Sequence, residues 1–257
     1  MLAARVTLIS VGFVLSLAAC MGSPTTVPDP RGGDGGSEGG DGDDGSGRGG
    51  GDGGGDPPPS LTALFVASDA ERMAYDSTFL PAVIATASNS VMRGVTTDFS
   101  TLPTTGSMTY AGFLEIVVGS SVAYANVAAP ASITLTLLDN GIIGEATGFM
   151  GSALDENLEE RLVNYAGTIL ITGGQVSDGP LGNAAVSLDI DGSIDSGLHV
   201  FNVDGTLIGS LYGLNGEGLR ARASTTSIDG DFSATVDGTP ALIGSGTLSA
   251  LVSPTTP

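Results

Sequence analysis

Residues 133–149 read ITLTLLDNGIIGEATGF, and this stretch decides the fold class. Apolar and polar side chains alternate over Ile133–Leu137, which is the period of a β-strand with one buried face. Asp139-Asn140-Gly141 follows, and a second apolar stretch then runs over Ile142–Phe149. Because Asn-Gly tolerates positive φ at both central positions of a two-residue turn, the stretch predicts a β-hairpin.

Similar segments continue on both sides of this hairpin. One face of the segment 108–116 carries the in-phase residues Met108, Tyr110, Gly112, Leu114 and Ile116. Further strands are predicted at Tyr165–Thr172, Ala185–Ile190, Leu219–Thr225, Phe232–Val236 and Ala241–Val252. The segment Leu198–Tyr212 is predicted to form two strands joined at Asp204-Gly205, and Asp237-Gly238 a further turn.

Short strands at regular spacing, separated by turn residues, are typical of an antiparallel sandwich or barrel and not of alternating β and α units. Eight or nine strands suit a barrel of about eight, which also removes exposed sheet edges. The predicted fold class is therefore all-β: a single antiparallel barrel of about eight strands, preceded by a short helical segment and a disordered tether.

The helical segment is expected within Leu61–Ala87. Ser68 or Asp69 supplies an N-cap, and Pro81 predicts the end of the helix because it lacks the amide hydrogen that a helix interior needs.

The chain begins with a predicted export signal. Arg5 gives a positive start, and the run Val6–Ala19 is apolar apart from three hydroxyl side chains. About 14 residues at 1.5 Å each are too short to cross about 30 Å of hydrocarbon, so the run is typical of a signal-peptide core.

Leu17-Ala18-Ala19-Cys20 resembles the bacterial lipobox, in which small residues precede a cysteine that is lipidated before cleavage. We therefore predict that Cys20 carries acyl chains and anchors the protein in a membrane. Met21 follows where Asp would retain a lipoprotein at the inner membrane, which favours the outer membrane. The alternative is a general secretory signal with a chance cysteine at this position.

The composition changes abruptly after Cys20. The segment Gly22–Ser60 is predicted to be a disordered tether of about 40 residues that spans roughly 35 Å, and Arg31–Asp56 within it is almost wholly Gly, Asp and Ser. Gly39–Asp44 matches the start of a calcium-binding Gly-Gly-x-Gly-x-Asp repeat, but a single copy without a following apolar residue is what such a tract yields by chance, so no metal is predicted. The predicted division is 1–19 signal peptide, 20–60 lipidated Cys and tether, 61–104 partly helical segment and 105–257 barrel domain.

Charge and cysteine content narrow the function classes. The chain has 8 basic residues, all arginine, against 28 acidic ones, for a net charge of −20. This charge repels phosphate backbones and anionic headgroups, so we expect no nucleic-acid partner and membrane contact through the lipid anchor alone. Cys20 is the only cysteine in the sequence, which excludes an intramolecular disulfide and, once it is lipidated, a cysteine nucleophile.

The segment 209–221, GSLYGLNGEGLRA, resembles part of the transferrin-binding protein B (TbpB) family. A strand end of the form Gly-x-apolar-Tyr-Gly, a short polar loop with Glu and a Gly-containing next strand are matched by Gly209, Leu211, Tyr212, Gly213, Asn215, Glu217 and Gly218. Tyr110–Gly112 and Gly244–Leu248 also look like strands of that barrel. The resemblance covers roughly residues 105–252 and implies a surface lipoprotein with an eight-stranded barrel. The chain has room for one such barrel, whereas a full receptor carries two lobes, so no ligand-contact residue and no transferrin binding is carried over.

No catalytic site is predicted, because no Gly-x-Ser-x-Gly elbow with a partner histidine is present. His199, the only histidine in the sequence, needs no function as a partly exposed strand residue, and the alternative is an axial ligand for haem or a metal. No cofactor is therefore expected.

Three sets of charged residues each allow a simple structural interpretation and a more specific functional one. The run Asp155–Arg161 is a solvated loop or, alternatively, a site for a cation or a basic partner. Asp189, Asp191 and Asp195 are spaced like calcium ligands, but Asp191-Gly192 is more simply a turn. Arg220 and Arg222 share one strand face, where an ordinary surface ion pair is the simpler alternative to an anion site.

The leading hypothesis is a non-enzymatic lipoprotein of the outer membrane, facing the cell exterior. Its barrel loops would bind an extracellular protein or a small-molecule ligand, for example in iron, haem or solute acquisition. The alternative is a structural or adhesive envelope lipoprotein without a small-molecule ligand. A filled barrel interior would move binding to the loops, whereas a cavity near His199 would favour haem.

Overall fold

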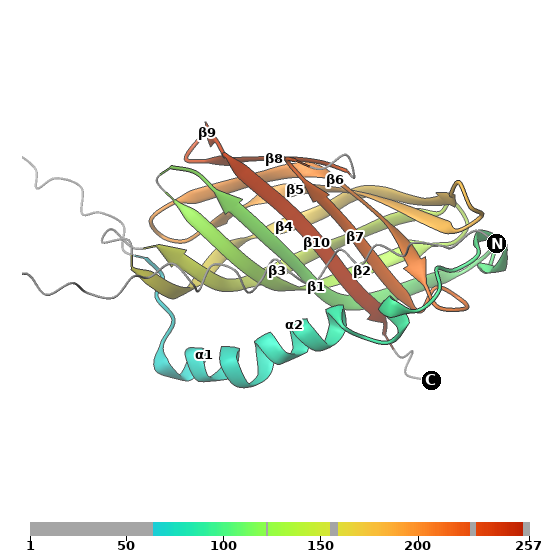
Figure 1. Cartoon of the computed structure of the whole chain (residues 1–257), viewed down its shortest axis with the longest axis horizontal. Helices are drawn as coiled ribbons and strands as arrows, with labels where there is room; N and C mark the ends of the chain where they lie inside the picture. Colours follow the sequence, from blue (N-terminus) through green and yellow to red (C-terminus); the bar gives the residue numbers. More distant parts are fainter. Residues whose placement is uncertain (1–63, 122, 155–158, 227–229, 254–257) are drawn as a thin grey trace, which may run out of the picture. The chain divides into compact units, whose positions relative to one another are not determined.

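A computed structural model describes residues 64–121, 123–154, 159–226 and 230–253 (Figure 1). Cys20, the signal segment, the predicted tether with Gly39–Asp44, and residues 155–158 of the acidic run lie outside these described residues.

The strands form a closed antiparallel barrel of eight positions. The ring follows the chain order and closes because β5 pairs with β6 and the last strand returns to the first. Its members are β1 (Ser107–Gly119), β2 (Tyr124–Thr136), β3 (Gly141–Leu154), β4 (Glu160–Asp178), β5 (Ala184–Asp195), β6 (Val200–Tyr212), β7 (Gly218–Ser224) and β10 (Ile243–Val252). The predicted single antiparallel barrel of about eight strands is confirmed.

Two further short strands, β8 (Asp231–Val236) and β9 (Thr239–Pro240), extend the barrel wall next to β6. The second half of β6 pairs with β7, whereas its first half pairs with β8. β7 and β8 therefore share one position in the wall. β9 pairs with β8 and leads into β10.

Two predicted turns are wrong, because Asp204-Gly205 and Asp191-Gly192 lie inside the continuous strands β6 and β5. Glycine occupies both positions because the backbone of the neighbouring strand passes too close for a side chain. A Cβ on Gly205 would lie 2.4 Å from the carbonyl oxygen of Asp231, and one on Gly192 would lie 2.2 Å from that of Thr168. Glycine at such positions marks a close backbone contact as readily as a turn.

The hairpin between β2 and β3 is confirmed, but its turn differs from the predicted two-residue form. The turn occupies residues 137–140, and of its residues Asn140 alone has a positive φ, of 55°. At the other predicted hairpin turn, Asp237 and Gly238 both have positive φ, of 50° and 79°.

A helical segment precedes the barrel and consists of α1 (Asp69–Ala74), the π-helical turn η1 (Tyr75–Phe79) and α2 (Leu80–Ala87). Ser68 caps α1 as predicted: its Oγ accepts the Glu71 amide hydrogen, and the Glu71 carboxylate accepts the Ser68 amide hydrogen at 2.8 Å. Pro81 does not end the helix, which corrects the prediction. It lies in the first turn of α2, after the π-helical turn, where an amide hydrogen is not needed.

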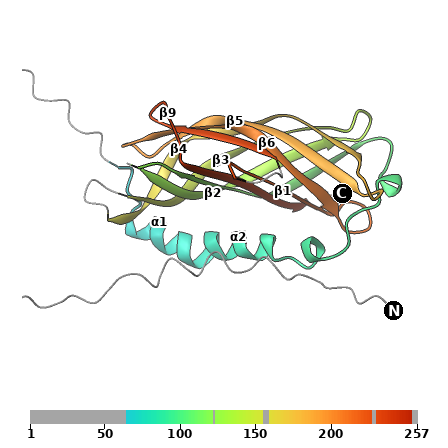
Figure 2. The same cartoon turned by 45° about the horizontal axis from the view of Figure 1, so that its top comes forward.

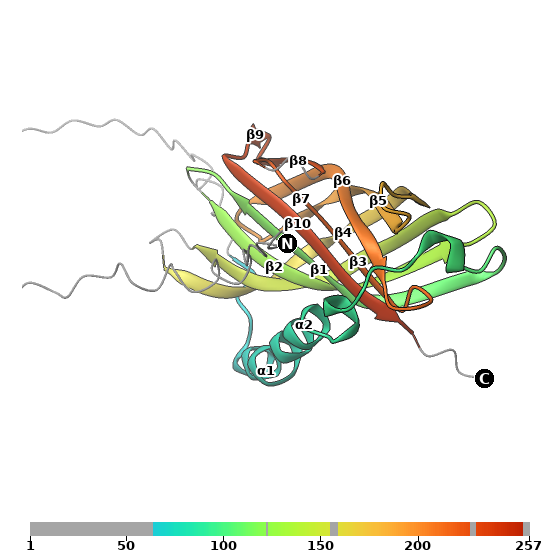
Figure 3. The same cartoon turned by 45° about the vertical axis from the view of Figure 1, so that its right-hand side comes forward.

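This helical segment lies along the outside of the barrel wall (Figures 2 and 3). Phe79 meets Phe113 of β1 edge to face with ring centroids 5.5 Å apart, and the Asn164 side chain donates to Glu71 at 2.9 Å. Val83 is the buried residue of α2. Within the described ranges, no helix is both long and apolar enough to cross a membrane.

The barrel interior is filled by side chains. Alternate residues of every long strand point inward, and the predicted in-phase set of β1 belongs to this inner face. The largest of these side chains have almost no surface that water can reach: Tyr110, Phe149, Phe201, Leu114, Ile116, Ile133, Leu188 and Ile190. Such packing leaves no room for a ligand of the size of haem in the core.

The two ends of the barrel differ in their relation to the N-terminal segment. At one end, which we call the proximal end, residues 65–67 add to the edge of β4: the Asn164 amide donates to Phe65 and the Ala67 amide donates to Leu162. At the opposite, distal end lie the β2–β3, β4–β5 and β6–β7 turns. In Figure 1 the proximal end is on the left and the distal end on the right.

Candidate functional site

The distal end carries a layer that we call the distal platform. It consists of the segment 94–106 and the three hairpin turns 137–140, 179–183 and 213–217. The segment 94–106, with the short 3-10 turn η3 (Phe99–Thr101), connects the helical segment to β1 and crosses this end on the way. Isolated bridges attach it to the barrel, from Thr96 to Tyr212 and from Asp98 to Asn183.

Backbone hydrogen bonds connect the parts of the platform. Thr97 is central: its amide donates to Leu211 at 3.0 Å, its hydroxyl donates to Gly213 at 2.7 Å, and its carbonyl accepts from Ala184 at 2.8 Å. Val176 beside the β4–β5 turn donates to Asn140 in the β2–β3 turn at 3.0 Å. Each turn is thus tied to a neighbour, so the platform has a defined shape before any partner binds.

The 213–217 turn is fixed further from inside the barrel. The Tyr110 hydroxyl donates to the Gly216 carbonyl at 2.8 Å, and burial raises the pKa of Tyr110, so the hydroxyl keeps its proton. The Glu217 carboxylate accepts the Asn215 amide hydrogen at 2.9 Å, and this bond lowers the pKa of Glu217. Gly213 and Gly216 have φ of 89° and 79°, as turn glycines do.

Each of the three hairpin turns of the platform carries a solvent-exposed leucine. Leu138 is 80% exposed, Leu181 is 94% exposed and Leu214 is 76% exposed, and Val95 beside them is also exposed. Isolated exposed leucines are common on protein surfaces. Three of them stand on separate hairpin turns of one barrel end whose backbones are held by hydrogen bonds, which makes this end the candidate interaction site.

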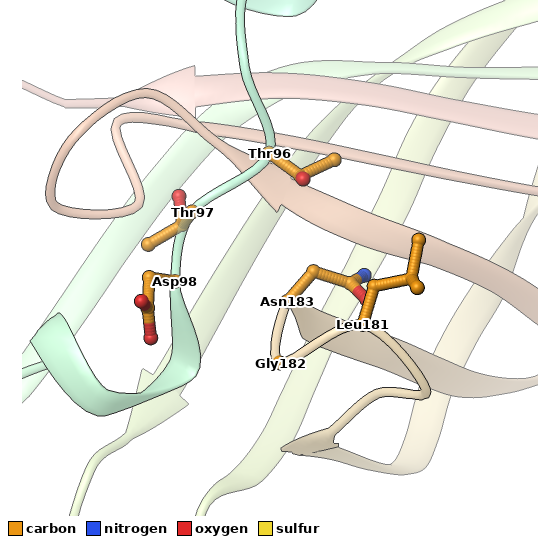
Figure 4. Close-up of a pocket in the computed structure, with 6 residues that line it drawn as sticks. All are labelled: Thr96, Thr97, Asp98, Leu181, Gly182 and Asn183. Atoms are coloured by element: carbon orange, nitrogen blue, oxygen red, sulfur yellow. The ribbon is translucent and has the colours of Figure 1, made fainter.

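A shallow pocket of about 260 Å³ lies in the platform (Figure 4). It is lined by Thr96, Thr97 and Asp98 from one side and by Leu181, Gly182 and Asn183 from the other. Figure 4 shows the Leu181 side chain beside this pocket, so an apolar group and a carboxylate border the same depression.

His199 lies at the proximal end, far from the platform. Its Nδ1 is 2.7 Å from Asp237 Oδ2, its ring meets Phe201 edge to face, and its side chain is 21% exposed. The Val200 amide also donates to Asp237, at 2.9 Å. The pair thus connects the β5–β6 and β8–β9 turns. The barrel core is filled by side chains and offers no cavity for haem.

The three aspartates of β5 face outward from the barrel wall. Asp189 accepts from the Thr206 hydroxyl at 2.8 Å and Asp195 accepts from the Gly197 amide at 2.7 Å. Asp191 lies opposite Asp204 of β6. In the described part of the chain, no group of three or more His, Cys, Asp or Glu residues has the arrangement of a metal site.

Arg220 and Arg222 both point outward from β7, as the alternation predicts. Burial raises the pKa of Glu115 on β1, and the positive charge of Arg220 opposes this shift only in part. Of the acidic run, Glu159 and Arg161 form an ion pair at the start of β4. Among the described residues, Glu217 of the family-like segment is the one predicted charged residue that lies in the platform.

The three leucines are not among the site residues predicted from the sequence. A signal was present, because each leucine stands among turn-forming residues: Leu138 before Asp139-Asn140-Gly141, Leu181 within Gly179–Asn183, and Leu214 within Gly213–Gly216. A large apolar residue within turn chemistry is unexpected unless it packs or binds.

Comparisons with known proteins add little to this geometry. No family model matches the sequence, and no curated protein is similar to it. Among the solved structures, intact Ap-TbpB with its N and C lobes is 15% identical, with a TM-score of 0.35 over 62% of this chain and 29% of that one. The chain thus spans less than a third of that protein's length. An eight-stranded barrel agrees with the fold that the TbpB resemblance implies, while membership of the family stays a prediction.

Proposed function

We propose that the protein is a non-enzymatic binding module that holds a protein partner on its distal platform. The observation that carries the proposal is the set of three exposed leucines on hydrogen-bonded turns of one barrel end. Turns that hydrogen bonds already hold in one shape lose less conformational entropy on binding than free loops do, so more of the free energy of their apolar contacts appears as affinity.

The shape of the site favours a protein over a small molecule. Small-molecule sites are concave and bury most of the ligand, whereas the leucines project from their turns and the adjoining pocket is shallow. The core is already occupied by side chains. Iron or haem acquisition, the narrower form of the hypothesis, would therefore use a carrier protein bound at the platform.

The proposal includes a lipid anchor at Cys20. Residues 65–67 join the barrel at its proximal end, opposite the platform. In a chain anchored in the outer membrane and facing the exterior, a long tether would leave the platform free to meet a partner. Replacement by Cys20→Ser is expected to abolish palmitate incorporation and to release the protein from the membrane fraction; unchanged labelling and fractionation would disprove the anchor.

The binding proposal is tested with two matched triple variants. In the tip variant Leu138, Leu181 and Leu214 become Ser. In the wall variant three exposed apolar residues outside the platform segments become Ser, namely Ile143 and Leu170 of the barrel wall and Leu242 at the proximal end. Protein cross-linked to the native chain at the surface of its own cells is identified by mass spectrometry and then purified. We expect the purified partner to bind the wild-type and wall variants, and to lose at least tenfold in affinity for the tip variant, because central apolar contacts dominate interface energy. Equal binding by all three chains would reject the platform as the site.

A further inference from the structure

Carboxylates stand next to the exposed leucines of the platform. Asp139 follows Leu138, Asp98 lines the pocket beside Leu181, and Glu217 closes the turn that carries Leu214. The four segments of the platform contain no arginine and no lysine, and Arg93 lies just before them. The apolar tips are thus interleaved with negative charge.

Each of these carboxylates is held in place by a backbone amide. Asp98 accepts from Ser100 at 2.9 Å, Asp139 from Gly141 at 3.1 Å and Glu217 from Asn215 at 2.9 Å. A carboxylate fixed in this way keeps its charge at a defined position. Its remaining oxygen lone pairs stay available to a cation on the partner.

We propose that the partner meets the platform with an apolar protein surface bordered by lysine or arginine side chains. This inference rests on the proposed function and states the chemistry of its partner. Charge complementarity fixes the register of the two surfaces and speeds their encounter, while the leucines supply the affinity.

Two other occupants fit these charges poorly. A membrane surface rich in anionic headgroups would be repelled by the carboxylates as the leucines approached it. A second copy of the chain meeting through the same end would bring like charges together across a two-fold axis.

The test uses the full chain and a synthetic amphipathic helix of leucine and lysine as probe. The comparison peptides replace lysine by glutamate or leucine by serine. The charge variant is Asp98→Asn with Asp139→Asn and Glu217→Gln, since amides keep the acceptor oxygen for each backbone bond. Its matched control removes the same charge from the wall, with Asp189, Asp191 and Asp204 each changed to Asn.

We expect the leucine-lysine peptide to bind, the tip variant to weaken it at least tenfold, and the charge variant to weaken it about three- to tenfold and to flatten its dependence on salt. The wall charge control is expected to bind like the wild type. Equal loss of affinity in the wall charge control would overturn the proposal, because the effect would then come from the overall acidity of the chain. Equal binding of the leucine-glutamate peptide would also overturn it, because apolar contact alone would then account for binding.

The same samples distinguish the other occupants and the underlying function. Leucine-dependent dimerisation in sedimentation, or leucine-dependent flotation with phosphatidylcholine vesicles, would replace the proposed partner with a second copy or a lipid surface. A natural partner that is lost in the tip variant but retained by the charge variant would leave the binding function standing and refute its cationic chemistry.

Discussion

Gly209 shows how closely the barrel wall is packed at the level of single residues. A Cβ added there would lie 1.8 Å from the carbonyl oxygen of Arg220 on β7, although Gly209 has no positive φ to explain its identity. Gly209→Ala is expected to lower the free energy of unfolding by about 3 kcal/mol or more, as overpacking does. Gly106, with a φ of 99° and open space around it, isolates the backbone effect. Gly106→Ala is expected to cost about 1 kcal/mol. Urea unfolding measures both, and equal costs would contradict the account.

Asp237 is expected to make the proximal end sensitive to acid. The hydrogen bond with His199, followed by that from the Val200 amide, lowers the pKa of Asp237. A carboxyl with a lowered pKa in the folded state stabilises the fold above its ordinary pKa of about 3.9, and this contribution is lost as the pH falls through the lowered value.

Asp237→Asn should therefore destabilise the protein at pH 7 by less than about 1 kcal/mol, because the side chain is half exposed, and the difference should vanish toward pH 2. Asparagine tolerates the positive φ of this position, so the backbone is not disturbed. Unfolding curves at several pH values measure the difference, with Asp191→Asn on the wall as control. A difference as large at pH 2 as at pH 7 would contradict the assignment.

At the scale of elements, the helical segment is expected to open independently of the barrel. Its side chains do not belong to the barrel core, and its contacts with the wall are few: Phe79 on Phe113, buried Val83 and the bond between Glu71 and Asn164. Elements with few buried contacts open locally at lower free energy than the core.

Hydrogen exchange should show residues 69–87 opening before β1–β5. Phe79→Ala should reduce the protection of the helical segment by about 1 kcal/mol or more, while the barrel strands keep theirs. Met73→Ala, which changes an exposed side chain of the same segment, is the control. Equal opening energies for the helical segment and the barrel would show that they unfold as one unit.

The elements of the barrel were largely predictable because alternation is a local signal. Ile133–Leu137 and the in-phase residues of β1 identified strands, and Asn140-Gly141 identified a turn. Glycine was the ambiguous residue: Gly192 and Gly205 suggested turns, but the neighbouring strands that require them are set by long-range pairing. Pro81 suggested the end of the helix, but the π-helical turn before it places it in the first turn of α2. No local sequence pattern indicates that turn.

At the scale of the whole molecule, the filled interior has a direct consequence for His199. Haem added to the protein should give no Soret band characteristic of axial imidazole ligation, because the core has no space for a porphyrin. Absorption titration of the wild type and His199→Ala measures this, and the two spectra should coincide. A shifted Soret band that disappears in His199→Ala would show that a haem site exists.

The candidate site was not predictable from local sequence. The leucines are 43 and 33 residues apart in the sequence order Leu138, Leu181, Leu214, and their common location depends on which turns share a barrel end. That assignment needs the number and order of the strands. Tyr110 illustrates the same limit, because its bond to Gly216 joins the first strand to the β6–β7 turn.

The central claim, that the distal platform binds a protein, is tested most directly by site-specific photo-crosslinking in the cells that make the protein. A photoreactive phenylalanine analogue replaces Leu181 on the platform in one chain and Leu242 at the proximal end in another, both being exposed positions. We expect one covalent adduct of defined mass from position 181, absent from position 242 and suppressed when Leu138 and Leu214 are changed to Ser. Adducts of equal yield from both positions, or none from position 181, would contradict it.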